Sequence, residues 1–279
     1  MSILHLPHAH PSAIVLDWHA TLVDTMDAMY HAVDDVIPKL SELGLIDRLV
    51  KPEHSKTIED TKLVRYIREH GHLHPKIKAE RKISRTDIFE VLFGTDREAK
   101  EIAHREFDKS YGKHFGAVKP MKPNARKNLQ ALRDMDIKLG VVSNRARTSM
   151  AHEIYTVDGS GWQDLFDTIV CGDDVEHRKP HPDLILKALK NLDEPAAPSC
   201  WYVGDSTTDV IAAKETRVTA VFYNGSGWDQ VWIDKIFPGT VRHPHEPDVV
   251  VNNLAELLAL AQRLVGAAAK NAWSDVKSR

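Results

Sequence analysis

The stretch "LDWHATLVDT", Leu16–Thr25, completes an apolar run that starts at Ala13 and ends at the acidic residue Asp17. A short apolar run of this length is typical of a strand that is buried on both faces. Side chains at the end of such a strand lie at the edge of the sheet, where polar groups can reach a ligand. Asp17 therefore marks a candidate site, and His19 stands two residues beyond it.

Further strand-length apolar runs alternate with helical patterns along the rest of the chain. One helical pattern places Ala125, Leu129, Leu132 and Met135 on the same face. Another starts at Asn253, which with Glu256 can cap a helix over Leu254–Val265. This alternation predicts an α/β fold, a doubly wound parallel sheet with helices on both faces. The predicted strands are Ala13–Asp17, Ile137–Ser143, Thr168–Cys171, Trp201–Gly204, Val218–Phe222 and Val249–Val251.

The gap between the first two strands, residues 25–115, is too long for a simple crossover and has helical character throughout. Helix ends are expected at Gly71 and Gly94, and helix starts at Ser84 with Asp87 and at Thr95 with Glu98. We therefore expect residues 1–25 and 116–279 to form the α/β core that carries the site, and residues 26–115 to form a helical cap domain. Ligands of open parallel sheets bind at the carboxyl ends of the strands, so this insertion would cover the site.

Composition restricts the functional class and the partners. The chain has 279 residues, of which 42% are apolar, and a formal net charge of -3, which argues against a nucleic-acid surface. No apolar run approaches the roughly 20 residues that cross a bilayer, and no signal segment opens the chain, so we expect no membrane partner and a cytoplasmic protein. Cys171 and Cys200 fall in strand-like runs and predict buried free thiols. The oligomeric state stays open.

Each predicted strand that faces the insertion is followed by a polar group: Asp17, then Ser143 with Asn144, then Lys179, then Asp205 with Asp209. Two carboxylates at adjacent strand ends would lie only about 5 Å apart, and a divalent cation relieves their repulsion. Mg²⁺ suits an all-oxygen site that also holds a phosphate. Lys179 could bind Asp17 and a phosphate oxygen, and Ser143 could donate a hydrogen bond. This set predicts phosphoryl transfer to an aspartate nucleophile.

These motifs resemble the haloacid dehalogenase superfamily of hydrolases, in the branch with a helical cap after the first strand. The resemblance covers residues 13–25 and 115–258. It implies a Mg²⁺-dependent phosphatase for a small phosphorylated metabolite, with an aspartyl-phosphate intermediate. The implied roles are Asp17 as nucleophile and metal ligand, Ser143 as phosphate ligand, Lys179 as charge clamp, Asp205 as metal ligand and Asp209 as its outer-sphere partner. Asn144 is an expected substrate contact, and Arg145 is either a contact for the leaving group or a surface residue at a helix start.

His19 departs from the family pattern, in which phosphatases carry an acid/base aspartate at this position and glycine in place of Ala20. In the family this position supplies its backbone carbonyl to Mg²⁺, so we expect His19 to keep that role. Imidazole, with an unperturbed pKa of about 6.5, can also transfer the proton to the leaving oxygen and from the attacking water. We expect the ring to face the leaving group.

Two other functions remain open. The Asp-Trp pair at Asp17–Trp18 is similar to that of phosphonoacetaldehyde hydrolase, which implies cleavage of a carbon–phosphorus bond through a Schiff base on a cap lysine such as Lys51 or Lys56. A chain that lost its acid/base residue could instead be a binding module, although it would then have no need for crowded carboxylates. The dehalogenases of the family use no metal and lack this pairing of acids.

Three alternating histidine pairs, His8/His10, His72/His74 and His243/His245, could bind transition metals, but the sequence identifies no third ligand for any of them. We interpret them as solvated loop histidines. No pattern specifies the substrate.

Overall fold

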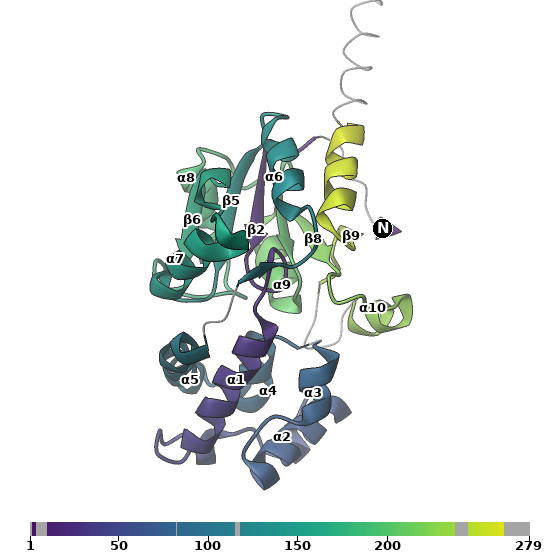
Figure 1. The fold of residues 1–279 in the computed structure, drawn as a ribbon. Coiled ribbons are helices and arrows are strands. Elements are labelled where there is room, and N and C mark those ends of the chain that lie inside the picture. Colours follow the sequence, from purple (N-terminus) through teal and green to yellow (C-terminus); the bar gives the residue numbers. More distant parts are fainter. Residues whose placement is uncertain (1, 4–9, 82, 115–117, 238–244, 265–279) are drawn as a thin grey trace, which may run out of the picture. The chain divides into compact units, whose positions relative to one another are not determined.

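The computed structural model describes residues 2–3, 10–81, 83–114, 118–237 and 245–264. The chain divides into two compact units (Figure 1): unit 1 comprises Met1–Asp24 and Lys119–Arg279, and unit 2 comprises Thr25–Val118. His8, His243 and the end of the helix predicted to reach Val265 lie outside the described residues.

Unit 1 is built on a sheet of seven described strands in the order β1-β9-β8-β7-β2-β5-β6. The edge strand β1 runs antiparallel to β9, and the other neighbours are parallel. Strand order reverses at the centre, where β2 pairs with both β5 and β7, which confirms the predicted doubly wound sheet. The strands are β1 (Ser2–Ile3), β2 (Ala13–Asp17), β5 (Lys138–Ser143), β6 (Thr168–Cys171), β7 (Cys200–Gly204), β8 (Thr219–Tyr223) and β9 (Val249–Val251).

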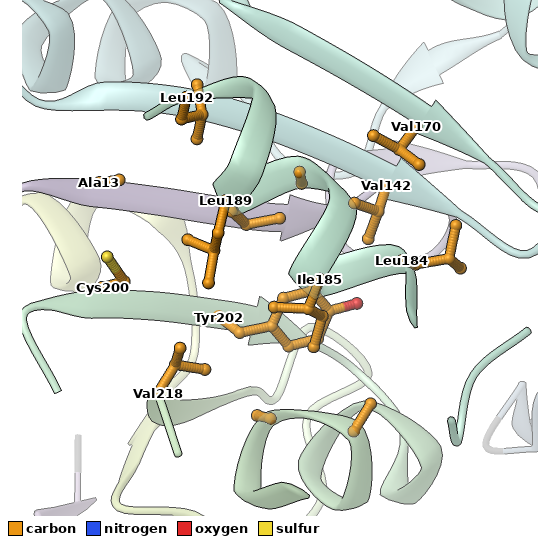
Figure 2. Close-up of a cluster of buried hydrophobic side chains, with 14 of the residues drawn as sticks. Ala13, Val142, Val170, Leu184, Ile185, Leu189, Leu192, Cys200, Tyr202 and Val218 are labelled. Carbon is orange, nitrogen blue, oxygen red and sulfur yellow. The ribbon is translucent and has the colours of Figure 1, made fainter. Parts of the chain in front are cut away.

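Helices flank this sheet (Figure 1). The buried face of α8 presents Leu184, Ile185 and Leu189 to the strands, as Figure 2 shows, and this cluster also includes Leu192, which follows the helix, and Tyr202. Full burial of each such side chain contributes roughly 1.5–3 kcal/mol. The helices of unit 1 are α6 (Ala125–Arg133), α7 (Arg147–Thr156), η5 (Val157–Gly159), η6 (Gln163–Leu165), α8 (Asp183–Asn191), α9 (Thr207–Thr216), α10 (Gln230–Ile236) and residues 254–264.

Unit 2 is helical, with α1 packed on α5 and with α4 in contact with α1, α2 and α5. Aromatic side chains of α4 and α5 fill its interior, with the rings of Phe89 and Phe107 6.4 Å apart. Its elements are α1 (Met26–Val36), η1 (Ile37–Lys39), η2 (Ile46–Arg48), η3 (Pro52–His54), α2 (Ile58–His70), α3 (Pro75–Glu80), α4 (Arg85–Phe93), α5 (Arg97–Tyr111) and η4 (Gly112–His114).

Local signals predicted some helix ends of unit 2 and missed others. Gly71 ends α2 at a φ of 68°, and the Ser84 side chain accepts a hydrogen bond from the backbone N–H of Asp87 at the start of α4. The predicted start at Thr95 is wrong, because the Asp96 side chain caps α5 instead, by accepting from the N–H of Ala99. The helical character expected throughout the insertion is wrong for residues 37–57, which form short 3₁₀ turns and loops.

A small two-stranded sheet joins the two ends of the inserted segment within unit 1. β3 (Val23–Asp24) pairs antiparallel with β4 (Lys119–Pro120), and the N–H of Met121 also donates to the carbonyl of Leu22. The chain therefore leaves and re-enters unit 1 at adjacent positions.

Two further features of the described residues concern the cysteines and the helices. Cys171 and Cys200 are buried and free, as predicted. Among the helices of the described ranges, none has both the length and the apolar character that crossing a bilayer requires.

Candidate active site

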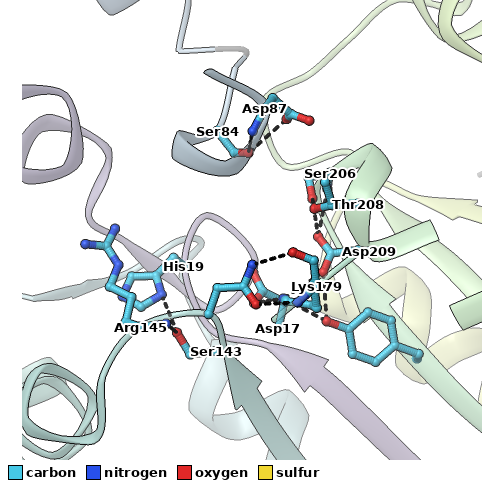
Figure 3. A network of polar contacts seen from close by, with 12 residues as sticks. Asp17, His19, Ser84, Asp87, Ser143, Arg145, Lys179, Ser206, Thr208 and Asp209 are labelled. Atoms are coloured by element: carbon cyan, nitrogen blue, oxygen red, sulfur yellow. Dashed lines mark hydrogen bonds and ion pairs between the residues drawn. The ribbon is translucent and has the colours of Figure 1, made fainter. Parts of the chain in front are cut away.

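The parallel register of the three central strands brings the predicted site residues together. Asp17 is the last residue of β2 and pairs with Val142 of β5, so Ser143 lies one residue further along the same edge. On the other side Leu16 pairs with Val203 of β7, so Asp205 follows at that edge as well. The loop after β6 supplies Lys179 and the first turn of α9 supplies Asp209 (Figure 3).

Lys179 is the centre of the charged network. Its Nζ donates to Asp17 Oδ1 at 2.5 Å, to Asp209 Oδ1 at 2.8 Å and to the hydroxyl of Tyr202 at 2.9 Å, and all four side chains are buried. Burial alone would lower the pKa of Lys179, but the charges of Asp17 and Asp209 outweigh it and raise the pKa above its usual value. The ammonium is therefore a permanent positive charge between two carboxylates.

The carboxyl of Asp17 is still difficult to ionise in spite of its contact with Lys179. Burial raises the pKa of its carboxyl from 3.8 to about 6, opposed by Lys179 and reinforced by the negative charge of Asp209. One lysine does not fully compensate the carboxylates that meet here. Asp17, Asp205 and Asp209 each offer an oxygen, and these oxygens lie within 4.8 Å of one another. An oxygen-only set with excess negative charge fits Mg²⁺.

Asp209 is already satisfied by protein donors. Its Oδ2 accepts from the backbone N–H of Ser206 at 3.1 Å and from the Ser206 hydroxyl at 2.6 Å, while Oδ1 accepts from Lys179 and from the Tyr202 hydroxyl. A Cβ at Gly204 would lie only 2.3 Å from Cγ of Asp209, so glycine is required for this approach. With both oxygens occupied, Asp209 is better placed to hold a water beside a metal than to bind the metal itself.

Asn144, which the sequence predicts as a substrate contact, is bound to the backbone of Lys179. Its side-chain Nδ2 donates to the backbone carbonyl of Lys179 at 3.0 Å, and its Oδ1 accepts from the backbone N–H of Lys179 at 2.8 Å. Both ends of the amide are thus bound to the backbone of the lysine. Asn144 positions Lys179 across the gap between two loops.

Ser143 and His19 contact each other directly. The Ser143 hydroxyl lies 3.1 Å from Nδ1 of His19 and accepts from the backbone N–H of Arg145 at 3.1 Å. Arg145 is only 4% exposed, so the surface alternative considered for it is wrong. Ala20 has a φ of 60°, a left-handed conformation that explains why glycine suits this position in the motif. The ring of His19 points toward Ser143, within the group of predicted site residues.

Glu153 of α7 is a polar residue that the sequence did not reveal. Its Oε2 accepts from the indole N–H of Trp18 at 2.8 Å and lies 2.8 Å from Nε2 of His19, and the residue is fully buried. Burying an unpaired carboxylate is costly, so these two contacts account for its presence. A signal existed: Glu153 stands three residues after Met150 and four before Val157, on the buried side of the helix.

The sequence did not reveal Tyr202 either, because a tyrosine within an apolar strand is usually a residue of the hydrophobic core. Burial and the charge of Asp209 raise the pKa of its hydroxyl well above 10, so the phenol stays neutral. It can therefore accept a hydrogen bond from Lys179 and donate one to Asp209 at the same time.

The chain is similar in sequence to hydrolases and phosphatases of known families. The sequence pattern of a family described as haloacid dehalogenase-like hydrolase matches residues 14–223. The chain is similar to the pyrophosphatase PpaX of Bacillus mycoides, 26% identical over 183 residues, which are 64% of this chain and 76% of the relative. It is also similar to the phosphoglycolate phosphatases of Salmonella typhi, 29% identical over 161 residues (58% and 59% of the two chains), and of Escherichia coli, 31% over 124 residues (44% and 48%).

The chain thus spans about half to three fifths of the length of these phosphoglycolate phosphatases. Solved structures share the fold. A hydrolase from Pseudomonas syringae superposes with a TM-score of 0.60 at 18% identity over 90% of this chain and 98% of that one. A superfamily hydrolase from Ehrlichia chaffeensis superposes with a TM-score of 0.50 at 18% identity over 92% and 98%.

Proposed function

Because the chain belongs to the haloacid dehalogenase-like hydrolases, we propose that it is a Mg²⁺-dependent phosphatase of a small phosphorylated metabolite, with Asp17 as the nucleophile. The observation that carries this proposal is the buried contact of Lys179 with Asp17 and Asp209, next to Asp205. The names of the relatives, a pyrophosphatase and phosphoglycolate phosphatases, support a small phosphorylated substrate.

In the first step a carboxylate oxygen of Asp17 attacks the phosphorus atom. A bond forms between that oxygen and phosphorus, the bond to the leaving oxygen breaks, and the leaving oxygen takes up a proton. Lys179 holds Asp17 in place through the 2.5 Å hydrogen bond and offsets negative charge as the phosphoryl group arrives. The Ser143 hydroxyl, whose oxygen accepts from the backbone N–H of Arg145, is our candidate to donate a hydrogen bond to a phosphoryl oxygen.

In the second step water attacks the phosphorus of the aspartyl-phosphate and gives up a proton. The bond between phosphorus and Asp17 breaks, which restores the carboxylate and releases inorganic phosphate. Asp17, Asp205 and the backbone carbonyl of His19 would hold Mg²⁺, with Asp209 one water away. When bound, the cation supplies positive charge that offsets the phosphoryl oxygens and the crowded carboxylates.

His19 is our candidate for both proton transfers. Glu153 lies against Nε2 and can accept a hydrogen bond from an N–H there, which leaves Nδ1 with a lone pair on the side of Ser143. In the first step a proton on Nδ1 would pass to the leaving oxygen, and in the second step the lone pair left on Nδ1 would take the proton of the attacking water, which restores the ring for the next turnover. Glu153 therefore acts as a positioning residue for the ring.

The experiment is a screen for phosphate release with Mg²⁺ present, which includes pyrophosphate, phosphoglycolate, sugar phosphates and phosphonoacetaldehyde. Asp17→Asn should abolish release, whereas Asp234→Asn, which changes an exposed carboxylate of α10, should not. Chelation of Mg²⁺ should stop turnover and added Mg²⁺ should restore it.

Two other outcomes would replace the proposal. Cleavage of phosphonoacetaldehyde alone, with borohydride trapping of the substrate on a lysine, would indicate the carbon–phosphorus hydrolase; Lys51 and Lys56, beside η3, are exposed, which disfavours the desolvated amine that a Schiff base needs. Absence of turnover across the screen, with retained binding of phosphorylated compounds, would indicate a binding module.

A further inference from the structure

Outside the site described above, a second group of metal-ligating side chains lies in the loop that carries Lys179. Among the described residues, three groups bring at least three ligand atoms together: Asp17/Asp205/Asp209, Cys171/Asp173/Asp174 and His177/His181/Asp183. In the second of these, burial raises the pKa of the Cys171 thiol to about 12, so it stays protonated and is a poor ligand. The third group has two imidazoles and one carboxylate. We propose that His177, His181 and Asp183 form a binding site for a transition-metal dication of the Zn²⁺ type.

The backbone brings the two histidines together. The N–H of His181 donates to the carbonyl of Arg178 at 3.0 Å and closes a turn over residues 178–181. The ring centroids of His177 and His181 are 4.4 Å apart, with an angle of 39° between the planes. Asp183, the first residue of α8, reaches back between them: its Oδ2 lies 3.1 Å from Nδ1 of His177 and its Oδ1 lies 2.8 Å from Nδ1 of His181.

These distances fit ligands that share an ion. Ligand atoms bound tetrahedrally at about 2.0–2.1 Å from zinc lie roughly 3.3 Å apart. The three donor atoms of this group lie within 4.8 Å of one another. Nδ1 of His181 is itself buried and forms no hydrogen bond of acceptable geometry, although Asp183 Oδ1 is 2.8 Å away. Two acceptor atoms at this distance need a cation between them, either a proton on Nδ1 or a metal ion, so the pair is suited to bind a dication in place of the proton.

Ion pairs alone are a weaker explanation for this arrangement. Two imidazolium rings at this separation would repel each other, and pairs at such exposed positions contribute only about 0–1 kcal/mol. The side chains of His177, His181 and Asp183 are 37%, 41% and 27% exposed, so water can complete the coordination of a bound metal. A dication satisfies all three groups together.

The donor type distinguishes this site from the proposed Mg²⁺ site. Two nitrogens and one oxygen favour Zn²⁺, Co²⁺, Ni²⁺ or Cu²⁺, whereas the three carboxylates around Asp17 favour Mg²⁺. His177 and His181 stand two residues before and two residues after Lys179. A metal held by both would link the two sides of Lys179 in the sequence and fix the loop that presents it. This inference does not depend on the proposed function, since metal binding is measured without turnover.

The test is a titration of the full chain with Co²⁺ after chelator treatment, in the presence of excess Mg²⁺ to occupy the oxygen site. We expect one equivalent of Co²⁺ with visible d–d absorption and no thiolate charge-transfer band, and displacement by Zn²⁺. His181→Ala and Asp183→Asn should each weaken binding by at least about 10-fold. Asp183→Asn retains a side-chain acceptor at the start of α8, so it separates loss of the ligand charge from loss of the fold.

His72→Ala is the matched control, because His72 is an exposed histidine whose ring packs against Tyr66 at 5.5 Å in unit 2. This variant should bind Co²⁺ as the parent chain does. The proposal is overturned if the parent chain binds no Co²⁺, if His181→Ala binds it unchanged, or if His72→Ala or Asp205→Asn removes the binding instead.

Discussion

Replacement of Asp17 by asparagine should stabilise the metal-free protein while it abolishes turnover. Burial raises the pKa of the Asp17 carboxyl from 3.8 to about 6, even with Lys179 in contact. Each pKa unit corresponds to about 1.4 kcal/mol, so ionisation of this group in the folded chain costs about 3 kcal/mol relative to the unfolded chain. Asparagine carries no charge and leaves Lys179 its contacts with Asp209 and Tyr202.

The pH dependence of the free energy of unfolding follows from the difference in the pKa of Asp17 between the folded and the unfolded chain. The pKa of Asp17 is higher in the folded chain than in the unfolded one, so its contribution reduces the free energy of unfolding as pH rises from about 4 to about 6, and the loss persists at neutral pH. At pH 7 in chelator, urea unfolding should therefore give Asp17→Asn an advantage of about 3 kcal/mol, which disappears near pH 4. Added Mg²⁺ should stabilise the parent chain more than the variant.

Asp234→Asn controls for the loss of one negative charge, because Asp234 is exposed and accepts a hydrogen bond from the side chain of Gln230. It should change stability by no more than about 0.5 kcal/mol at either pH. The reasoning fails if Asp17→Asn is no more stable than the parent at pH 7, or if the two chains lose stability in parallel between pH 4 and 6.

The remaining predictions concern the groups around Asp17. Lys179→Met should leave two buried carboxylates without their shared cation, so the metal-free chain should lose about 3–5 kcal/mol in urea unfolding and turnover should fall by at least about 10²-fold; parent-like turnover would exclude the clamp. His19→Ala should slow turnover by about 10²–10⁴-fold and His19→Asp should recover part of it, and an unchanged steady-state rate for His19→Ala would exclude proton transfer by this ring. Glu153→Ala should cost about 1–3 kcal/mol because the Trp18 indole loses its acceptor, whereas Glu153→Gln keeps one; equal stability of the two variants would contradict this. With Mn²⁺ in place of Mg²⁺, anomalous scattering should show a peak between Asp17 and Asp205, and a map with no peak there would refute the ligand assignment.

The sheet could be predicted from the sequence because its strands are short apolar runs with clear ends. Since parallel strands end at one edge, the residues that follow them could also be assigned to a common place. Contacts between loops could not be predicted in this way. Asn144 was placed correctly at the end of its strand, but its contact with the backbone of Lys179 depends on how two loops meet. The helical spacing could have marked Glu153 as buried, but its partners Trp18 and His19 come from a distant segment and could not be predicted. The sequence predicts a helix start at Thr95 with Glu98, but the side chain that accepts from the N–H of Ala99 is that of Asp96, which also binds Arg48 from a distant segment.

The pairing of β3 with β4 makes unit 2 a replaceable module. Val23 and Asp24 lie opposite Pro120 and Lys119, so the two ends of the insertion are only about 5 Å apart. A two-residue turn such as Asn-Gly can join antiparallel strands at this spacing, which means that residues 25–118 could be exchanged for a hairpin without stretching the chain. The residues assigned to the site all belong to unit 1, so such a shortened chain, or one that carries the insertion of a relative, would test whether unit 2 affects the choice of substrate.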